Sequence, residues 1–441
     1  MRRCLRIVLM AATAIAAVAA VGAAEEDGAL RQRVMRILRD VPLIDGHNDA
    51  PWQYRRRVNN RLDALDLAGD LSNAEPPMHT DIPRLRAGGV GGQFWAAYLP
   101  IGKPGGQPGD ARIALEQIDL IRRLVDRHSD QLELALTADD VERIHAAGKI
   151  ASLIGVEGGH AIENSLAVLR MTYELGARYL TLTHNRSLDW ADAATDAPLA
   201  GGLSPFGKEV VREMNRLGMM VDLSHVAPAA MHAALDVTRA PVVFTHSSAY
   251  EVCRHVRNVP DDVLLRVKEN GGVVMVCFVG SFVSEELRLW QVAYAAERNR
   301  LRRERPDDRK QAAAELQVWR EANPRPEATM AQVADHIDHI RELIGVDFIG
   351  IGGDYDGTTS LPVGLEDVST YPDLFVELLR RGYTDEDVAK IAGRNILRVM
   401  REVERVAEEL RKTEPPSEAA IEELDAEVRA GRERGDDDNN D

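Results

Sequence analysis

Short apolar segments recur along most of the chain, and stretches with the periodicity of amphipathic helices separate them. The predicted strands cover residues 43–49, 91–99, 151–157, 179–184, 219–225, 242–246, 273–279 and 348–354. The predicted helices between them cover residues 113–128, 138–147, 165–175, 205–217, 227–237 and 261–269. Eight strands that alternate with helices predict an α/β fold of the (β/α)8 TIM-like barrel type.

A doubly wound open sheet is the alternative architecture for the same alternation. It would normally carry a GxGxxG turn between an early strand and the following helix. The glycine-rich stretch at residues 88–92 instead leads into a predicted strand. The barrel therefore remains the prediction.

Two helical regions extend the predicted barrel domain, which covers residues 25–410. A charged segment at about 284–343 lies before the last strand, and its charges indicate a solvated helical insertion. An amphipathic C-terminal helix is predicted over 385–410. A polar tail follows over 411–441, and it ends in an acidic stretch that predicts disorder.

The first 24 residues differ from the rest of the chain. Arg2, Arg3 and Arg6 give a positive start, an uncharged and mostly apolar run follows, and small residues gather before Glu25. This is the layout of a cleavable signal peptide. A retained anchor is the alternative, because about 18 apolar residues are borderline for spanning a bilayer. We expect cleavage, export to the periplasm or medium, and no stable membrane span. The C-terminal residues form no apolar tail of the kind that a GPI lipid anchor requires, so we do not expect such an anchor.

Composition narrows the function classes. The sequence has 54 Lys and Arg against 71 Asp and Glu, a formal net charge of −17. This balance argues against a nucleic-acid partner, which requires a concentrated basic face. The three cysteines, Cys4, Cys253 and Cys277, form no CxxC pair. Cys253 and Cys277 could form a disulfide, but we expect buried free thiols because Cys277 lies within a predicted strand. Any metal must therefore bind to histidines and carboxylates.

Six of the eight predicted strands end in a histidine or a carboxylate. In (β/α)8 enzymes the active site lies at the carboxyl ends of the strands. A single histidine there would usually be a hydrogen-bonded core residue, but six such positions would each need a separate buried partner. We therefore expect a functional cluster, built from His47 with Asp49, Glu157, His184, His225, His246 and Asp354.

Nitrogen and oxygen ligands of this kind suit Zn²⁺ or another borderline divalent ion. Five of them exceed the three protein ligands that are usual for one catalytic zinc, so we predict two ions about 3.5–4 Å apart. Glu157 is the natural bridge, because it comes from a different strand from the other ligands. Such a pair lowers the pKa of a bound water to about 7, which suits hydrolysis of an amide or an ester. The predicted metal ligands are His47, Asp49, Glu157, His225 and His246.

Seven short segments, taken together and in order, match the motifs of a known family. They are LIDGHND at 43–49, GVEGG at 155–159, LTLTHN at 180–185, VDLSH at 221–225, HSSAY at 246–250, RNVPDD at 257–262 and GIGGDYDG at 350–357. On these segments the chain resembles the membrane (renal) dipeptidase family, the zinc dipeptidases of peptidase family M19. The resemblance spans residues 40 to 400. It implies that His47 and Asp49 hold one zinc, that His225 and His246 hold the other, and that Glu157 bridges them.

The resemblance also implies substrate contacts for His184, Arg257 and Asp354. Arg257 can clasp a carboxylate through a bidentate fork, and His184 can steady the scissile carbonyl oxygen. Asp354 can orient the attacking water and carry its proton to the leaving amine, so that Asp354 and Glu157 are the expected catalytic residues. Asp356 is the alternative to Asp354, but it lies further into the loop. His160 is expected in a supporting role, and the other histidines on the surface or in packing.

These observations predict an exported dipeptidase with two zinc ions per chain, acting on small dipeptides. The resemblance further implies tolerance of a C-terminal D-residue, β-lactam hydrolysis in some members, and a homodimer. A lactonase, cyclic amidase or phosphotriesterase on the same barrel is one alternative. Those enzymes often use a carbamylated lysine late in the barrel, and no lysine ends a predicted strand here. A non-catalytic binding protein on a decayed barrel is the other alternative.

Overall fold

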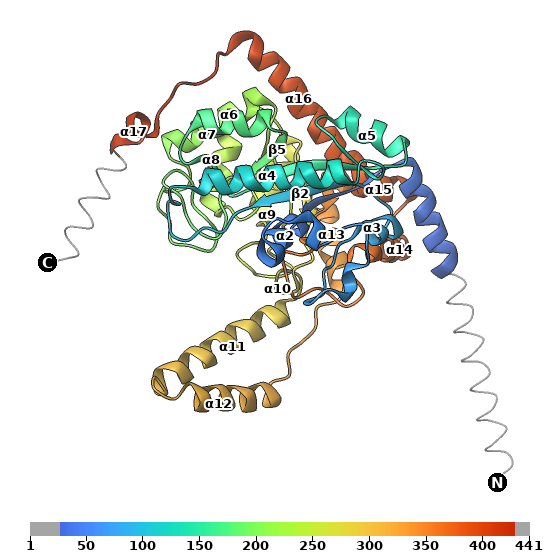
Figure 1. Ribbon diagram of the computed structural model, residues 1–441, viewed down its shortest axis with the longest axis vertical. Coiled ribbons are helices and arrows are strands. Elements are labelled where there is room, and N and C mark those ends of the chain that lie inside the picture. Colours follow the sequence, from blue (N-terminus) through green and yellow to red (C-terminus); the bar gives the residue numbers. More distant parts are fainter. Residues whose placement is uncertain (1–26, 428–441) are drawn as a thin grey trace, which may run out of the picture.

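A closed barrel of parallel strands forms the centre of the computed structural model, which describes residues 27–427 (Figure 1). The barrel strands are β1 (Leu43–Asn48), β2 (Val90–Tyr98), β4 (Ile150–Glu157), β5 (Ala177–Thr181), β6 (Met220–Asp222), β7 (Val243–Phe244), β8 (Val273–Val276) and β9 (Ile349–Ile351). Pairing of β2 with β4 and of β9 with β1 closes the ring. Each of the eight predicted strands overlaps one of these, so the barrel prediction is confirmed. A short strand that was not predicted, β3 (Leu132–Leu134), pairs with the first residues of β4.

Helices surround the barrel. Residues 27–40 are helical. The barrel helices are α2 (Ala50–Val58), α3 (Ile82–Ala87), α4 (Asp110–Arg127), α5 (Ala138–Ala146), α6 (Leu166–Glu174), α7 (Pro205–Leu217), α8 (Pro228–Val237), α9 (Asp261–Asn270), α13 (Met330–Ile344) and α14 (Tyr371–Arg380). Several begin at a Ser or Thr whose side chain accepts a backbone N–H of the first turn, as Thr137, Ser165 and Ser204 do. Short 3₁₀ turns lie at η1 (Leu62–Ala64), η2 (Leu71–Asn73), η3 (Gly159–Ile162), η4 (Val346–Phe348) and η5 (Val368–Thr370).

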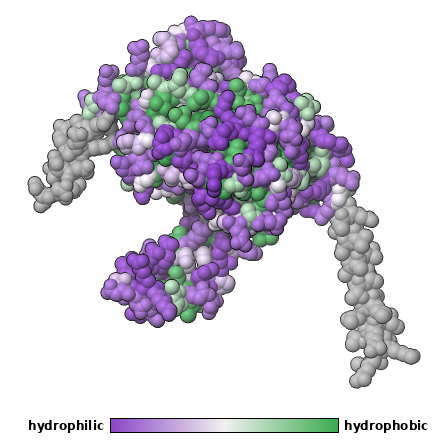
Figure 2. Space-filling view, in the orientation of Figure 1, coloured by the Kyte–Doolittle hydropathy of each residue, from purple (hydrophilic) through white to green (hydrophobic). Residues whose placement is uncertain are grey.

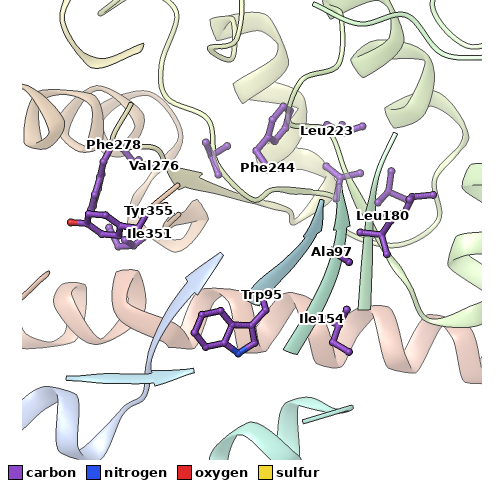
Figure 3. Close-up of a cluster of buried hydrophobic side chains, with 14 of the residues drawn as sticks. Trp95, Ala97, Ile154, Leu180, Leu223, Phe244, Val276, Phe278, Ile351 and Tyr355 are labelled. Carbon is purple, nitrogen blue, oxygen red and sulfur yellow. The ribbon is translucent and has the colours of Figure 1, made fainter. Parts of the chain in front are cut away.

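The core has two parts, because every barrel strand is buried on both faces. Outward-facing side chains pack under the helices. Among them, Trp95, Ile154 and Leu180 project from three neighbouring strands, β2, β4 and β5 (Figure 3). A second cluster joins side chains from inside the barrel, such as Leu153 and Met275, to helices α5 and α16. These interior residues close the amino end of the barrel, so the polar site is confined to the other end.

The predicted insertion before the last strand, at about residues 284–343, is helical, which confirms this part of the fold prediction. Helix α10 (Gly280–Val283) leads into α11 (Glu285–Glu304) and α12 (Arg309–Ala322), which form a hairpin that projects from the barrel (Figure 1). Trp290 of α11 packs against Tyr294 and Trp319, with ring centroids 5.2 and 5.9 Å away. Figure 2 shows the hairpin standing away from the body with a mostly hydrophilic surface. Helix α13 instead packs on α9 and α14 in the outer layer.

The C-terminal helical extension is also present. It consists of α15 (Asp385–Ala389), the π-helical turn η6 (Lys390–Arg394), α16 (Asn395–Thr413) and α17 (Ile421–Leu424). The predicted signal peptide over 1–24 and the acidic stretch over 435–441 lie outside the described residues. Between residues 27 and 427, no helix combines the length and the apolar character needed to cross a bilayer. Cys253 and Cys277 are buried free thiols, as expected.

Candidate active site

The site residues predicted from the strand ends meet at the carboxyl end of the barrel. His47 lies in β1 and Glu157 is the last residue of β4. The other predicted residues lie in loops, because the strands end earlier than the apolar pattern does. His184 follows β5, His225 follows β6, His246 follows β7 and Asp354 follows β9, while Asp49 precedes α2.

Glu157 lies at the centre of this cluster. Its Oε1 is 3.0 Å from His225 Nε2 and 3.4 Å from His246 Nε2. Its Oε2 is 3.5 Å from His47 Nε2. Burial raises the pKa of Glu157, but the surrounding histidines, led by His47 and His184, hold it well below the usual range. The carboxylate is therefore ionised and has one oxygen toward each side of the cluster.

A second group joins the two aspartates to the same histidine. His47 Nε2 is 3.3 Å from Asp49 Oδ2, and the ligand atoms of His47, Asp49 and Asp354 all lie within 4.8 Å of one another. The groups His47–Glu157–His246 and Glu157–His184–His225 meet the same limit. The structure thus brings together all five predicted metal ligands, with His184 and Asp354 beside them.

The donor set fits divalent metal ions. The Nε2 atoms of His225 and His246 are only 3.0 Å apart, and the buried His47 Nε2 has no hydrogen-bond partner within the described chain. Burial, with a contribution from Arg257, lowers the pKa of both His225 and His246 well below that of free imidazole. Burial lowers the pKa of His47 too, but Tyr179, Glu157 and Asp49 together raise it well above that of free imidazole, so a metal bound to this histidine would displace a proton. Cations bound in the cluster would also balance the charges of Asp49 and Glu157, which are buried beside each other.

The metal-facing histidines are held in place by side chains that the sequence reasoning missed. Tyr179 Oη lies 2.9 Å from His47 Nδ1 and donates to Gly46 O at 3.3 Å. His47 can therefore donate its Nδ1 proton to the tyrosine and keep Nε2 free for a metal. The phenol reaches this point because residue 155 is a glycine, where a Cβ would lie 1.9 Å from the Tyr179 ring.

His246 has a comparable support. Thr245 Oγ1 is 2.9 Å from His246 Nδ1 and donates to Asp222 Oδ2 at 2.7 Å. Asp222 is fully buried and also accepts from Thr181 Oγ1 at 2.6 Å. A carboxylate inside an apolar strand segment was the signal that could have pointed to this network.

Arg257 is a buried cation beside the cluster. Its Nη1 and Nη2 make long contacts of 3.4 Å to Ser247 Oγ and His246 O, and its Nε has no hydrogen-bond partner within the described chain. No carboxylate among residues 27–427 forms an ion pair with it. Burial lowers its pKa from that of a free guanidinium, which is nevertheless always protonated at neutral pH. The guanidinium is therefore available to bind an anionic group of a ligand.

The two aspartates of the last loop have different surroundings. Desolvation raises the pKa of Asp354 well above its usual range, and Asp49 and Glu157 add to the effect. Asp356 instead accepts from the backbone N–H of His79 at 2.9 Å, and its own N–H donates to His79 Nδ1 at 3.0 Å. Asp354 is thus the aspartate that lies with the predicted metal ligands.

The loop backbone around these aspartates is tightly constrained. His225, Asp354 and Asp356 have φ values of 69°, 58° and 64°, in the left-handed region that non-glycine residues rarely adopt. Gly357 lies against the two carboxylates, where a Cβ would be 2.2 Å from Asp354 Oδ1 and 2.3 Å from Asp49 Oδ2. Only a glycine lets this backbone approach the aspartates so closely.

A cavity of about 450 Å³ opens onto the cluster. Glu157, His184, His225, Arg257 and Asp354 contribute to its wall. So do His79 and His255, which we expected only on the surface or in packing. The expected support residue His160 lies outside the three ligand groups, and its Nε2 is 3.2 Å from Leu99 O. Aromatic and cationic side chains complete the wall, among them Trp52, Tyr98, Arg56, Arg57 and Phe282.

Comparison with known proteins decides the family. The model of the membrane dipeptidase family, peptidase family M19, matches residues 31–414. The chain belongs to the membrane dipeptidase family. It is 43% identical to Dipeptidase 3 of Rattus norvegicus over 388 residues, which are 87% of this chain and 69% of that protein.

Solved structures agree with this membership. The probable dipeptidase PvdM from Pseudomonas aeruginosa shares the fold with a TM-score of 0.72 at 22% identity, over 86% of this chain and 99% of that one. A metallopeptidase from Rhodobacter sphaeroides, bound to a phosphinate mimic of the dipeptide L-Ala-D-Ala, has a TM-score of 0.67 at 25% identity, over 82% of this chain and 99% of that one. As a member of the membrane dipeptidase family, the chain is a metallodipeptidase.

Proposed function

We propose that the chain is an exported dipeptidase that binds two zinc ions and hydrolyses the single peptide bond of small dipeptides. The position of Glu157 is the observation that carries the proposal, since its two oxygens face His47 on one side and His225 with His246 on the other. His47 and Asp49 would hold one ion, His225 and His246 the other, and Glu157 would bridge them. The nitrogen and oxygen donors favour zinc over a harder cation such as Mg²⁺.

Two zinc ions bound here would supply an activated water and would polarise the scissile carbonyl group. The protein's own residues then orient the substrate. Arg257 clasps the C-terminal carboxylate of the dipeptide with a guanidinium that no protein carboxylate neutralises. His184, whose Nε2 is 3.8 Å from Glu157 Oε1, lies where it can donate to the carbonyl oxygen as negative charge develops there.

Asp354 serves as the proton carrier. Its raised pKa and its place beside Asp49 let the carboxyl group accept a proton from the attacking water and pass it to the leaving amine. The same carboxylate contacts the free amino group of the substrate. Recognition of both ends, by Arg257 and by Asp354, limits the enzyme to dipeptides because a longer peptide could not place both termini correctly at once.

The similarity to the Rhodobacter sphaeroides enzyme supports acceptance of a C-terminal D-residue, since that protein binds a mimic of L-Ala-D-Ala. The layout of residues 1–24 supports export. The family also supports a homodimer, which sedimentation of the purified protein tests.

A metal titration with a substrate panel tests the proposal. Protein stripped with a chelator and reloaded should bind two zinc ions per chain and hydrolyse L-Ala-L-Ala and L-Ala-D-Ala, but not tri-alanine. A lactone and a phosphotriester belong in the panel, and hydrolysis of these in preference to dipeptides would contradict the assignment. N-terminal sequencing of the exported protein should find the start after Ala23 or Ala24.

A further inference from the structure

Helix α2 contributes a row of side chains to the cavity. Asp49, Trp52, Gln53 and Arg56 lie at positions i, i+3, i+4 and i+7, which is one face of a helix, and all four line the cavity. The row begins at a predicted metal ligand and ends at a cation. Seven residues at 1.5 Å per residue place Arg56 about 10 Å farther along the helix than Asp49.

Three consecutive arginines of α2 have different surroundings. Arg55 points away from the cavity, and its Nη1 is 2.8 Å from Glu116 Oε2. Arg57 donates from Nε to Gln53 Oε1 at 2.9 Å and also donates to the carbonyl oxygen of Pro76, so its partners are neutral. Arg56 forms no ion pair and no hydrogen bond with any residue between 27 and 427, although it lines the cavity and is exposed.

None of the carboxylates that line the cavity forms an ion pair with Arg56 in the described part of the chain. Asp356 attracts Arg57 electrostatically and also forms hydrogen bonds with His79. Asp49 and Asp354 belong to the metal-binding cluster. Arg56 is therefore a cation in the cavity wall without a paired carboxylate, in a protein whose net charge is −17.

The direction of the substrate decides which side chain would meet this charge. Arg257 lies over the ring of Phe282 on one part of the cavity wall, where the C-terminal carboxylate is proposed to bind. The free amino group is proposed to lie by Asp354, which adjoins Asp49 at the start of α2. The side chain of the N-terminal residue is therefore the one that extends along α2.

We propose that Arg56, with Arg57 behind it, forms a subsite for an acidic side chain on the N-terminal residue of the dipeptide. This inference rests on the proposed function and adds a substrate class to it, namely dipeptides that begin with Asp or Glu. Arg56 would act on the substrate through its charge, since its Cα lies about 10 Å along the helix from that of Asp49, the nearest predicted metal ligand on α2.

Matched dipeptides test the subsite. The ratio of kcat/KM for Glu-Ala to that for Gln-Ala reports the charge of one side chain in nearly the same shape. We expect a ratio of about five or more at low salt, falling as the ionic strength rises. The variant Arg56→Gln should lower the ratio at least about threefold, through a loss of kcat/KM for Glu-Ala and not through a gain for Gln-Ala. Arg55→Gln is the control, because it removes an equal charge from the same helix outside the cavity.

The position of the charge is tested with the reversed pair. The ratio for Ala-Glu to Ala-Gln should be unaffected by Arg56→Gln. An equal Glu-Ala and Gln-Ala rate, an unchanged ratio in Arg56→Gln, or a larger effect on the reversed pair would each overturn the subsite while Ala-Ala hydrolysis upholds the proposed function. Loss of turnover on every dipeptide in the wild-type enzyme would overturn both.

Discussion

The two ends of the barrel interior are built from opposite kinds of side chain, and strand β4 shows both. Leu153, Gly155 and Glu157 occupy alternate positions on the same inward face. Leu153 belongs to the apolar cluster at the amino end, and Glu157 is the centre of the polar cluster at the carboxyl end. About 13 Å of strand separates the two Cα atoms.

The comparison shows where the fold is stabilised and where it is strained. The amino end buries apolar surface, which favours folding by about 25 cal/mol for each Å². The carboxyl end buries like charges beside one another, and three of its residues have positive φ values, each costing about 1–3 kcal/mol. Substitutions at the two ends should therefore have different effects, and the predictions below are ordered by their expected effect on turnover.

The largest effect is expected for Glu157→Gln at the polar end. An amide cannot bridge two cations as a carboxylate does, so bound metal and activity should be lost together, with kcat/KM falling at least about a thousandfold. Metal analysis and dipeptide hydrolysis measure both. Glu133→Gln, which affects only a surface pair with Arg143 and Lys149, is the control. A Glu157→Gln protein with two metals and normal turnover would contradict the bridging role.

A smaller loss of turnover is expected for Gly357→Ala. The added methyl group would overlap Asp49 and Asp354, and moving either carboxylate by about 1 Å should reduce kcat about a hundredfold. Gly28→Ala is the control, because no atom lies within 4 Å of its added methyl group. Normal kinetics for Gly357→Ala would show that the close approach does not position the aspartates.

Removing the tyrosine hydroxyl should have a moderate effect. In Tyr179→Phe, His47 loses the partner of its Nδ1 atom, and affinity for the metal proposed to bind at His47 should fall about tenfold. Competition with a chromophoric chelator measures this affinity. Tyr173→Phe removes a hydroxyl outside the site and should leave the metal affinity unchanged. Equal affinities in the wild type and in both variants would argue that Tyr179 does not support His47.

The smallest effect on turnover is expected at the apolar end. Leu153→Ala should destabilise the protein by about 2–5 kcal/mol, because it leaves a cavity in the core. The folded fraction should still hydrolyse dipeptides within about threefold of the wild-type rate, because Glu157 is four residues away. Chemical denaturation and turnover measure the two quantities, with the exposed Leu136→Ala as reference. A hundredfold loss of turnover would show that the two ends are coupled.

Much of the fold was predictable because each barrel strand is buried on both faces and so forms a continuous apolar segment. The pattern could not show where strand pairing stops. Four site residues continue the apolar segments but lie beyond the ends of the strands, namely His184, His225, His246 and Asp354. A strand ends where its neighbours stop pairing with it, and this depends on their register. The predicted ligands nevertheless meet, because loops at the carboxyl ends of barrel strands converge.

The surroundings of the site were harder to predict. The contact between Tyr179 and His47 depends on a glycine in a third strand, and the pairing of His79 with Asp356 joins residues 277 positions apart. Neither contact leaves a local pattern in the sequence. The roles assigned to Arg257 and His184 remain predictions, and Gly357→Ala tests the placement of Asp354.

The projecting α11–α12 hairpin leads us to expect that this molecule unfolds in two stages. Trp290 and Trp319 pack together in the hairpin, whereas Trp95 and Trp190 are buried in the barrel. Leu287 and Trp290, near the start of α11, pack against the main core, whereas the rest of the hairpin projects, so we expect the projecting part to form a separate cooperative unit that opens at a lower temperature. Fluorescence from the hairpin tryptophans would then change at a lower temperature than the calorimetric transition of the barrel. A single melting temperature would describe neither the hairpin nor the barrel.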